Sequence, residues 1–321
     1  MSDVFASLPG LEVPVGDVGG GFAKLWAGTD IQDLKAIQLN LVLHLGRQIT
    51  PEDARVQFDV ATRFAQRYPC RVVILCPDSR EEAPPEIRAK IYGECFLGKS
   101  KGDTRCVEFV LLHYTMSARQ YLENQVSLCL STDLPLYYWA HRFSTAARLA
   151  DYHYLLTRSQ RILFDSAVVP PEAFTYPWPN PAALRDLAYT RTLQLRQNLG
   201  QFLSRYDPLL ITLGLEAVVL RHGQDLAAEG ACLLAWIKKG LLRAGVSGSS
   251  EIQYTLQERT TPGSFTLDFA YGGGAKSFHW MADLASNHAE FAGRLRTEPA
   301  ALAVGARLLA PEEALGEAMF G

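Results

Sequence analysis

The sequence predicts an α/β protein of two domains: an N-terminal mixed sheet with parallel core strands and flanking helices, and a C-terminal α+β domain with antiparallel strands. Three observations predict this fold class. The length of 321 residues corresponds to about two domains. Strand-like and helix-like segments alternate in the first half, whereas strand-like segments separated by turns dominate the end of the second. A segment with five prolines, residues 170–181, lies between the halves.

The predicted boundaries follow from composition. Residues 1–28 hold many prolines and glycines and few periodic apolar positions, which predicts an extended N-terminal arm. The N-terminal α/β domain is then expected over residues 29–172 and the proline-rich linker over residues 173–181. The C-terminal α+β domain is expected over residues 182–321.

Two helices and a strand are predicted at the start of the N-terminal domain. Residues 30–45 begin with a capping aspartate and carry apolar side chains at helical spacing, which favours a helix. Thr50 followed by Pro51 indicates the start of a second helix, which we expect to end near Tyr68. Residues 71–76, RVVILC, form a continuous apolar run, which is typical of a strand covered on both faces.

A hairpin and a helix are predicted next. Residues 87–97 alternate between apolar and polar side chains, which predicts a half-exposed strand. Residues 106–114 are expected to be its hairpin partner. Ser117 with Gln120 has the spacing of a capping box, which predicts a helix over residues 118–130.

The last strands of this domain are expected over residues 136–140 and 161–164, with a helix capped by Ser144 between them. Helical crossovers of this kind make the connected strands parallel.

The C-terminal domain is expected to begin with a long helix from Pro181 to about Tyr206. Residues 209–220 are compatible with a strand or a helix, because short apolar runs cannot be resolved by period alone. A second helix and three strands complete the prediction, with a turn of three glycines before the last strand; these elements cover residues 226–243, 251–259, 264–271 and 276–281.

Composition excludes several classes of function. The 31 Lys and Arg residues against 34 Asp and Glu give a formal net charge of −3, so the basic surface that general nucleic-acid binding needs is missing. No apolar run approaches the roughly 18 residues of a membrane span. The first 20 residues contain no Lys or Arg, unlike an export signal, so we expect a cytoplasmic protein.

Cysteine and histidine patterns do not predict a metal or cofactor. The six cysteines show no CxxC pair and no zinc-ligand spacing, which favours reduced and mostly structural thiols. The seven histidines show no HExxH spacing, and no GxSxG segment is present. We therefore expect no metal, no cofactor and no catalytic residue.

One short motif leaves an alternative open. Residues 93–100, GECFLGKS, match the phosphate-binding loop pattern GxxxxGK[ST]. Such a loop needs a buried strand that ends before its first glycine and a helix that begins at the lysine. The alternation through Gly93 instead favours the tip of a hairpin. The alternative is a nucleotide-binding enzyme that uses Gly98, Lys99 and Ser100.

The carboxyl ends of the predicted parallel strands are a second candidate site. Five side chains would gather at this edge and could bind a small ligand: Asp78, His141, Arg142, Asp165 and Ser166. The interpretation we favour is structural. Asp165 and Ser166 would then cap a turn, and Arg142 would pair with a carboxylate.

Three longer segments carry a more specific signal. They are STDLPLYYWAHR (131–142), RILFDSA (161–167) and DLAYTRTLQLRQNL (186–199). In this order and at this spacing they resemble the glucose-6-phosphate dehydrogenase assembly protein family, OpcA. The likeness is strongest between residues 105 and 208, and Tyr189 stands where many members have tryptophan. The positions that match the family's pattern, or lie beside it, are Asp133, Trp139, His141, Arg142, Asp165, Ser166, Asp186, Thr190, Arg191 and Arg196.

The resemblance implies a non-enzymatic partner that binds glucose-6-phosphate dehydrogenase and promotes its active oligomeric form. Such an allosteric activator would support NADPH production in the oxidative pentose phosphate pathway. The motif residues would either face this partner or brace the junction of the two domains. The oligomeric state of the chain itself stays open.

Some related proteins are linked to thiol redox control, so the resemblance also implies that cysteines of this chain are candidates for redox regulation. Cys95 and Cys106 lie on the two predicted hairpin strands and could face one another, so they are the redox candidates. Burial of these thiols would argue against such a role.

Overall fold

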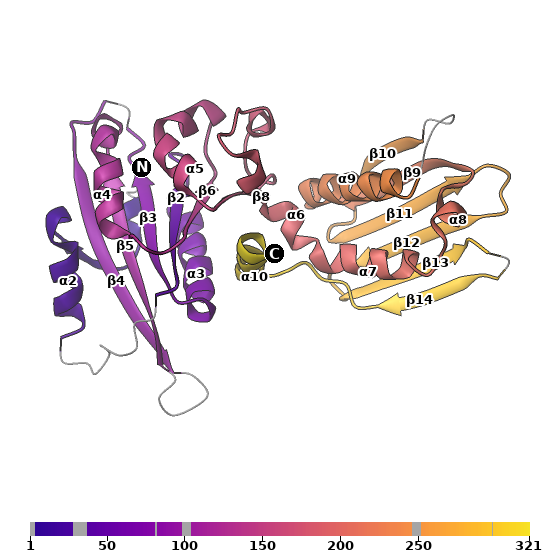
Figure 1. The fold of residues 1–321 in the computed structure, drawn as a ribbon, viewed down its shortest axis with the longest axis horizontal. Helices are drawn as coiled ribbons and strands as arrows, with labels where there is room; N and C mark the ends of the chain where they lie inside the picture. Colours follow the sequence, from indigo (N-terminus) through magenta and orange to yellow (C-terminus); the bar gives the residue numbers. More distant parts are fainter. Residues whose placement is uncertain (1–3, 28–36, 81, 98–103, 246–251, 297) are drawn as a thin grey trace. The chain divides into compact units, whose positions relative to one another are not determined.

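The computed structural model confirms the predicted fold class, with an eight-stranded mixed sheet and a six-stranded, mostly antiparallel sheet (Figure 1). The chain forms two compact units, and the first combines Met1–Leu187 with Pro311–Gly321, while the second is Ala188–Ala310. The structure describes residues 4–27, 37–80, 82–97, 104–245, 252–296 and 298–321.

The N-terminal sheet has the strand order β1-β4-β5-β3-β2-β6-β7-β8. The six strands from β5 to β8 in this order are parallel, whereas β4 is antiparallel to β5 and β1 to β4. The strands are β1 (Leu11–Val13), β2 (Leu39–Leu45), β3 (Cys70–Pro77), β4 (Ile87–Leu97), β5 (Thr104–Tyr114), β6 (Leu136–His141), β7 (Arg161–Phe164) and β8 (Leu184–Asp186).

Helices cover both faces of this sheet, so two hydrophobic cores form. One core includes α1 (Val4–Ser7), α3 (Pro51–Arg67) and α10 (Pro311–Phe320). The other includes α2, η3, α4, η4 and α5. These are α2 (Val18–Leu25), η3 (Met116–Tyr121), α4 (Leu122–Cys129), η4 (Ala146–Tyr152) and α5 (His153–Arg158).

Local signals explain α3, which forms where it was predicted. The Thr50 hydroxyl accepts a hydrogen bond from the backbone N–H of Asp53, and Pro51 occupies the first helical position. Phe58 and Phe64 are both buried in the core that this helix shares with the sheet. The strands predicted over residues 71–76, 87–97, 106–114, 136–140 and 161–164 are also confirmed as β3 to β7.

The prediction of a helix over residues 30–45 is wrong for its second half. Residues 39–45 form β2, a central strand between β3 and β6, and every residue of it is buried. A strand that is buried on both faces is apolar along most of its length. Its apolar residues therefore also match the spacing of a helix, so the spacing could not distinguish a strand from a helix. Residues 30–36 lie outside the described part of the chain.

The N-terminal arm is not extended away from the domain. Phe5 is fully buried, and β1 pairs with β4 through Leu11 opposite Ile91. A short 3-10 turn, η1 (Val15–Asp17), then leads into α2. Prolines and glycines at this end shape tight turns in a packed segment, which composition alone does not distinguish from a free arm.

The predicted linker also belongs to the first unit. It holds the turns η5 (Pro171–Phe174) and η6 (Pro181–Ala183), and the Trp178 indole N–H donates to the Ala173 carbonyl inside the core. Strand β8 then pairs with β7, so the first unit continues to Leu187. The last eleven residues also belong to it, because Leu315 packs in the same core as α3.

Two helix predictions need correction. Residues 118–130 divide into η3 and α4, and the Ser117 hydroxyl donates to the Ala83 carbonyl instead of forming a capping box. The long helix predicted from Pro181 is replaced by η6, β8 and two helices, α6 (Leu187–Arg191) and α7 (Leu193–Leu203).

The C-terminal unit has the strand order β10-β9-β11-β12-β13-β14, in which only β9 and β10 are parallel. Its core packs the sheet against α7 and α9, which lie over one face (Figure 1). The elements are α8 (Pro208–Thr212), β9 (Leu215–Gly223), α9 (Ala227–Arg243), β10 (Gln253–Arg259), β11 (Ser264–Tyr271), β12 (Ser277–Asp283), β13 (His288–Arg294) and β14 (Ala300–Val304).

Most predictions for this unit are confirmed. Residues 209–220, left open between helix and strand, contain both, since α8 is followed by β9. The glycine turn between β11 and β12 has Gly273 and Gly274 at positive φ, which glycine adopts without strain. Strands β13 and β14 and the final helix were not predicted.

Candidate functional site

The best candidate site lies at the carboxyl edge of the N-terminal sheet, between β2 and β6. From β2 the chain crosses through α3 to β3, whereas from β6 it crosses through η4 and α5 to β7 on the other side. Neighbouring parallel strands whose connections diverge in this way leave a crevice beyond their ends.

The two loops that follow these strands touch. A Cβ atom placed on Gly46 would overlap the carbonyl oxygen of Arg142, so only glycine allows this approach. Arg142 itself has φ 51°, a left-handed conformation that a residue with a side chain rarely adopts. Such backbone strain often marks a functional site.

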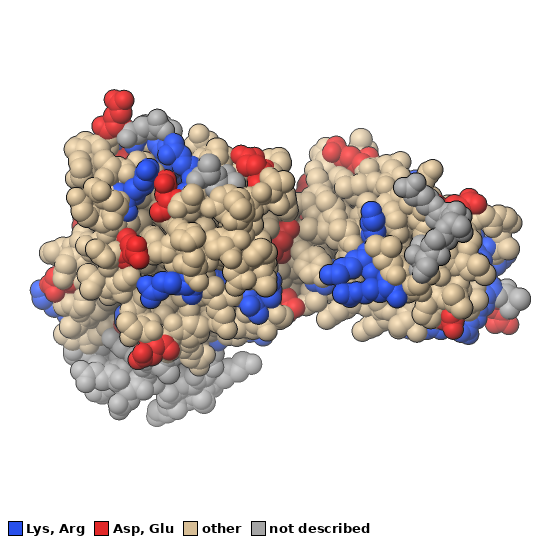
Figure 2. All heavy atoms as spheres, turned by 45° about the horizontal axis from the view of Figure 1, so that its top comes forward, with Lys and Arg blue, Asp and Glu red and all other residues tan. Residues whose placement is uncertain are grey.

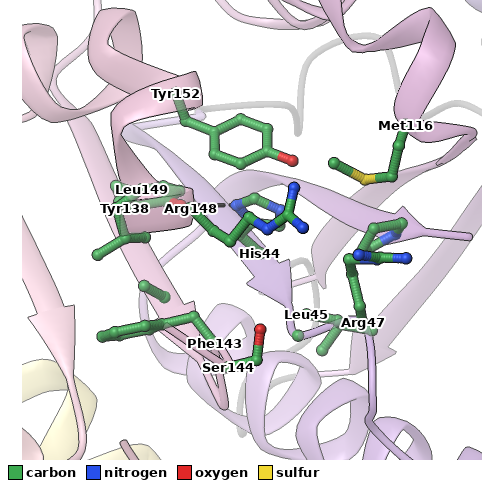
Figure 3. A pocket seen from close by; sticks show the side chains of 13 residues that line it. His44, Leu45, Arg47, Met116, Tyr138, Phe143, Ser144, Arg148, Leu149 and Tyr152 are labelled. Carbon is green, nitrogen blue, oxygen red and sulfur yellow. Dashed lines mark hydrogen bonds between the residues drawn. The ribbon is translucent and has the colours of Figure 1, made fainter. Parts of the chain in front are cut away.

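Two connected hollows open beside these loops. The first is a narrow cleft of about 30 Å³, whose lining includes His44, Tyr138, Phe143, Leu149 and Tyr152 (Figure 3). The second is wider, about 510 Å³, and we call it the arginine bowl. It is lined by Arg47, Met116, Ser117, Arg119, Gln120 and Arg148. Arg47, Met116 and Arg148 line both hollows, so the cleft continues into the bowl.

A buried chain of hydrogen bonds lies along the cleft. His44 Nδ1 is 2.6 Å from the Tyr138 hydroxyl and His44 Nε2 is 2.9 Å from the Tyr114 hydroxyl. The Tyr114 hydroxyl is in turn 2.6 Å from that of Tyr152. Every polar atom of this group therefore has a partner, which fixes the position of the Tyr152 hydroxyl.

Burial keeps this group neutral. It lowers the pKa of His44 to about 3, and it raises the pKa of Tyr114 and of Tyr138 well above the ordinary value for tyrosine. A neutral imidazole donates through one nitrogen and accepts through the other. At neutral pH the floor of the crevice is thus polar but uncharged.

The arginines of the bowl come from three separate segments. Arg47 follows β2 and donates to the carbonyls of Asp78 and Ser79 at 3.4 and 3.0 Å. Arg119 lies on η3, 3.4 Å from the Asp151 carboxylate, and Arg148 lies on η4. Figure 3 shows the side chains of Arg47, Arg148 and Tyr152 around one opening.

The five edge residues that the sequence predicted to gather are divided among three local clusters. In the first, Arg80 donates to Asp78 at 2.6 Å, and His113 Nε2 is 3.7 Å from the same carboxylate. The hydrogen bond from Arg80 lowers the pKa of Asp78 below its ordinary value, although burial opposes it.

The second cluster joins the end of β6 to the start of α3. His141 and Arg142 lie 3.2 and 2.5 Å from Asp53 Oδ2. Burial alone would raise the pKa of Asp53, but hydrogen bonds from Gln57 and His141 and the charge of Arg142 hold it below its ordinary value. The prediction that Arg142 pairs with a carboxylate is confirmed.

The third cluster joins the ends of β7 and β8. Asp165 Oδ1 accepts from the backbone N–H of Ala167, so it caps the turn as the structural interpretation predicted. The Ser166 backbone N–H donates to Asp186 Oδ1 at 3.0 Å.

The remaining family-motif residues are divided between the units. Asp133 is exposed in the turn before β6, and Trp139 is buried beside His141. In the C-terminal unit Arg191 pairs at 2.6 Å with Glu229, which is 4% exposed.

Two further motif side chains lie near this pair in sequence. Arg196 lies over the Tyr189 ring at 3.8 Å and donates to its hydroxyl, while Thr190 is buried.

The structure does not support the phosphate-binding loop. Strand β4 runs through Gly93 to Leu97, so no strand ends before the first glycine. A Cβ at Gly93 would meet the Trp26 ring, which explains the glycine by packing. Gly98, Lys99 and Ser100 lie outside the described residues.

The hairpin holds a disulfide where free thiols were expected. Cys95 and Cys106 face one another across β4 and β5 and are bonded, as their predicted positions allowed. The expectation of reduced thiols therefore fails for this pair. The other four cysteines are present as thiols, and three of them are buried.

The described residues contain neither a cluster of metal ligands nor a membrane-spanning helix. No group of three His, Cys, Asp or Glu side chains is placed to hold a metal ion. No helix in this part of the chain is both long enough and apolar enough to cross a membrane. On the face drawn in Figure 2, basic side chains form small clusters among acidic ones.

Comparison with known proteins gives a match to part of the N-terminal unit. Residues 61–177 match the family described as glucose-6-phosphate dehydrogenase subunit N-terminal domain. The predicted resemblance to the glucose-6-phosphate dehydrogenase assembly protein family is confirmed. The part that matches this assembly protein family runs from within α3 to beyond η5, and it includes Arg119, Arg148 and Tyr152.

A similar protein is described as a putative OxPP cycle protein OpcA from Synechocystis sp.. It is 26% identical over 110 residues, which are 34% of this chain and 22% of the relative. The matched segment thus spans about a fifth of the relative's length. The family's name points to an assembly protein rather than to a catalytic enzyme.

The sequence did not reveal the arginine bowl. His44 lies in the helix predicted over residues 30–45 and Arg47 lies beyond its end, while Arg119, Arg148 and Tyr152 belong to no motif that the sequence analysis singles out. The one available signal is the run LNLVLHLGR, in which a histidine and an arginine follow an apolar strand-like segment.

Proposed function

We propose that this chain is a non-catalytic partner of glucose-6-phosphate dehydrogenase that binds the enzyme and promotes its active oligomeric form. The observation that carries the proposal is the match of residues 61–177 to the family named after this enzyme. In this proposal the chain acts as an allosteric activator in the cytoplasm and supports the supply of NADPH.

The bonding of the family-motif residues supports a scaffold role. Asp186 binds the backbone of Ser166, and Arg191 binds Glu229. Polar side chains that are engaged within the chain hold loops and helices in fixed positions. The motif thereby stabilises a surface that another protein can recognise, and it does not present a reactive group.

The proposal has a thermodynamic requirement. A partner shifts an oligomerisation equilibrium only by the difference between its affinities for the two states. A tenfold shift requires about 1.4 kcal/mol of preferential binding to the active oligomer. The chain must therefore contact a surface that the active oligomer has and the inactive form lacks.

The test mixes the purified chain with glucose-6-phosphate dehydrogenase from the same organism. We expect the two proteins to elute together in size-exclusion chromatography with light scattering, at a mass that contains a larger dehydrogenase oligomer. We also expect kcat or KM of the dehydrogenase to improve. Separate elution together with unchanged kinetics would refute the proposal.

Asp133 offers a test of the contact surface, because it is an exposed motif residue in a turn. Asp133→Lys should weaken the complex by about tenfold or more, as reversal of an interfacial charge does. Asp59→Lys, on the exposed side of α3, is the matched control and should leave the affinity unchanged. Equal effects of the two variants would remove Asp133 from the interface.

A further inference from the structure

The sheet of the C-terminal unit ends at β14, at its lower edge in Figure 1, and this edge strand differs from the other edge strands. Edge strands of folded proteins are usually protected from further pairing by shortness, charge or proline. Strands β1 and β8, at the edges of the N-terminal sheet, have three residues each, and β10 carries Glu258 and Arg259. Strand β14 has five residues, AALAV, and none of them is charged or a proline. Of the edge strands in the two described sheets, β14 is therefore the least protected.

The backbone of β14 presents hydrogen-bonding groups at this edge. The Ala306 N–H donates to the Asn287 carbonyl at 3.2 Å, in the same register that pairs β14 with β13. Since antiparallel strands exchange hydrogen bonds at every second residue, Leu302 directs its N–H and C=O at β13. The N–H and C=O groups of Ala301 and Ala303 therefore point away from the sheet. In the part of the chain that the structure describes, no partner bonds to these four groups.

The side chains of β14 are apolar on both faces of the sheet. Ala300, Leu302 and Val304 pack against the core of the C-terminal unit and are only partly buried, so part of their surface stays accessible. Ala301 and Ala303 lie on the other face and are exposed. A further strand at this edge would cover the accessible apolar surface and extend the core.

The order of the side chains favours a second copy of this chain as the further strand. A twofold interface requires each contact to occur twice, with the two residues exchanged. An antiparallel copy centred on Leu302 places Ala301 opposite Ala303 of the second copy, and Ala303 opposite Ala301 of the second copy. Each of these two pairs exchanges two backbone hydrogen bonds, so the outward groups of both chains gain partners.

The charge next to the strand does not oppose this arrangement. Glu298, an exposed acid that precedes β14, would lie opposite Ala306 of the second copy and would meet no like charge there. The Leu302 side chains of the two chains would meet at the twofold axis and bury apolar surface. We propose that two copies of this chain pair through β14 and form one continuous sheet.

This inference goes beyond the binding of the dehydrogenase and does not depend on it, so the test uses the full chain alone. An interface built on one short strand is small, and we expect a dissociation constant in the micromolar range. In analytical ultracentrifugation the mean mass should rise reversibly from that of one chain, 35.5 kDa, toward twice this value near about 100 μM. The mass of one chain at every concentration up to about 500 μM would overturn the inference.

Hydrogen exchange of the unaltered chain locates the interface without any variant. Amides at an unpaired edge exchange quickly, whereas hydrogen bonds to a second chain protect them. We expect the exchange of residues 300–304 to slow at high protein concentration, while the exchange of the other edge strand, β10, stays unchanged. A dimer without protection of β14 would also overturn the inference.

Two variants test the pairing itself. Ala303→Pro removes an outward N–H and leaves the bonds to β13 in place, so it should weaken association by about tenfold or more. Ala301→Lys with Ala303→Lys places lysines of the two copies directly opposite one another and should have a similar effect. Ala270→Lys, at an exposed alanine on β11 inside the same sheet, is the matched control and should leave association unchanged. Equal dissociation constants for the control and both β14 variants would refute pairing through β14.

Discussion

The carboxylate of Asp186 accepts a hydrogen bond from the backbone N–H of Ser166 at 3.0 Å. This contact joins two family motifs at the end of the N-terminal sheet. Asp186→Ala should therefore lower the free energy of unfolding by about 1–3 kcal/mol, because a partly buried donor is left without its partner. Asp186→Asn keeps an acceptor oxygen and should cost less. Urea denaturation followed by tryptophan fluorescence measures both, and equal stabilities of Asp186→Ala and the unaltered chain would contradict the assignment.

The contact of Gly46 with Arg142 gives a second prediction. Gly46→Ala should destabilise the N-terminal unit by about 2 kcal/mol, because the new Cβ would overlap the Arg142 carbonyl oxygen and force the loops apart. Gly240→Ala is the control. Gly240 lies in α9 with open space around it, so alanine there should stabilise by about 0.5–1 kcal/mol. Thermal melts that rank the two variants in the opposite order would show that the loops relax freely.

In the C-terminal unit, the pair of the half-buried Arg191 and the buried Glu229 gives a third prediction. Glu229→Ala should cost about 3 kcal/mol, because the Arg191 charge would lose its carboxylate partner in a largely enclosed position. Replacing both residues by leucine should cost much less, since neither charge then remains. Denaturant unfolding of the single variants and of the double variant checks this. If the stability losses of the single variants add up in the double variant, the two side chains do not interact.

The pH dependence of the unfolding free energy should reveal the lowered pKa of His44. Burial lowers its pKa to about 3, whereas the imidazole of the unfolded chain titrates near 6.5. The unfolded state therefore binds more protons between these values, so this contribution to stability is present above pH 6.5 and is lost as the pH falls toward 3. For this residue we expect a loss of about 2 kcal/mol between pH 7 and pH 5.

The control for this experiment is a second histidine. His44→Gln should reduce the pH dependence of the unfolding free energy, whereas His153→Gln, on the exposed side of α5, should not. The same slope in the His44→Gln variant and in the unaltered chain would exclude His44 as its source.

The disulfide between Cys95 and Cys106 gives a fifth prediction. Thiol labelling in denaturant should find four reactive cysteines without reductant and six after reduction, since the other four cysteines are thiols. In the chain-entropy treatment, a bridge that closes this short loop stabilises by about 3 kcal/mol, so Cys95→Ser with Cys106→Ser should lower the melting temperature. Six reactive thiols before reduction would show that the bond does not form in solution and would remove this pair as a redox candidate.

Elements with strong local signals could be predicted from the sequence. The cap of α3 lies within four consecutive residues, and Thr50, Pro51 and Asp53 act through contacts that neighbouring residues make by themselves. The hairpin of β4 and β5 could be predicted for a similar reason, because its alternation repeats every second residue. Neither inference required knowledge of the rest of the chain.

Elements whose identity depends on distant partners could not be predicted in this way. Leu39 to Leu45 could have formed a helix, and only the neighbours β3 and β6 make the segment a strand. The proline-rich segment looked like a linker until the pairing of β8 with β7 placed it inside the first unit. In each case a long-range contact outweighed the local pattern.

The sequence by itself determined the family resemblance, the fold class and the edge at which the parallel strands end, because these depend on residue order and on short-range periodicity. The tertiary structure alone decided that Arg47, Arg119 and Arg148 line one hollow above the His44 network. These arginines lie far apart along the chain, and they meet because β2 lies between β3 and β6 in the sheet. Spacing in sequence does not encode strand order, since that order is set by which buried surfaces pack together.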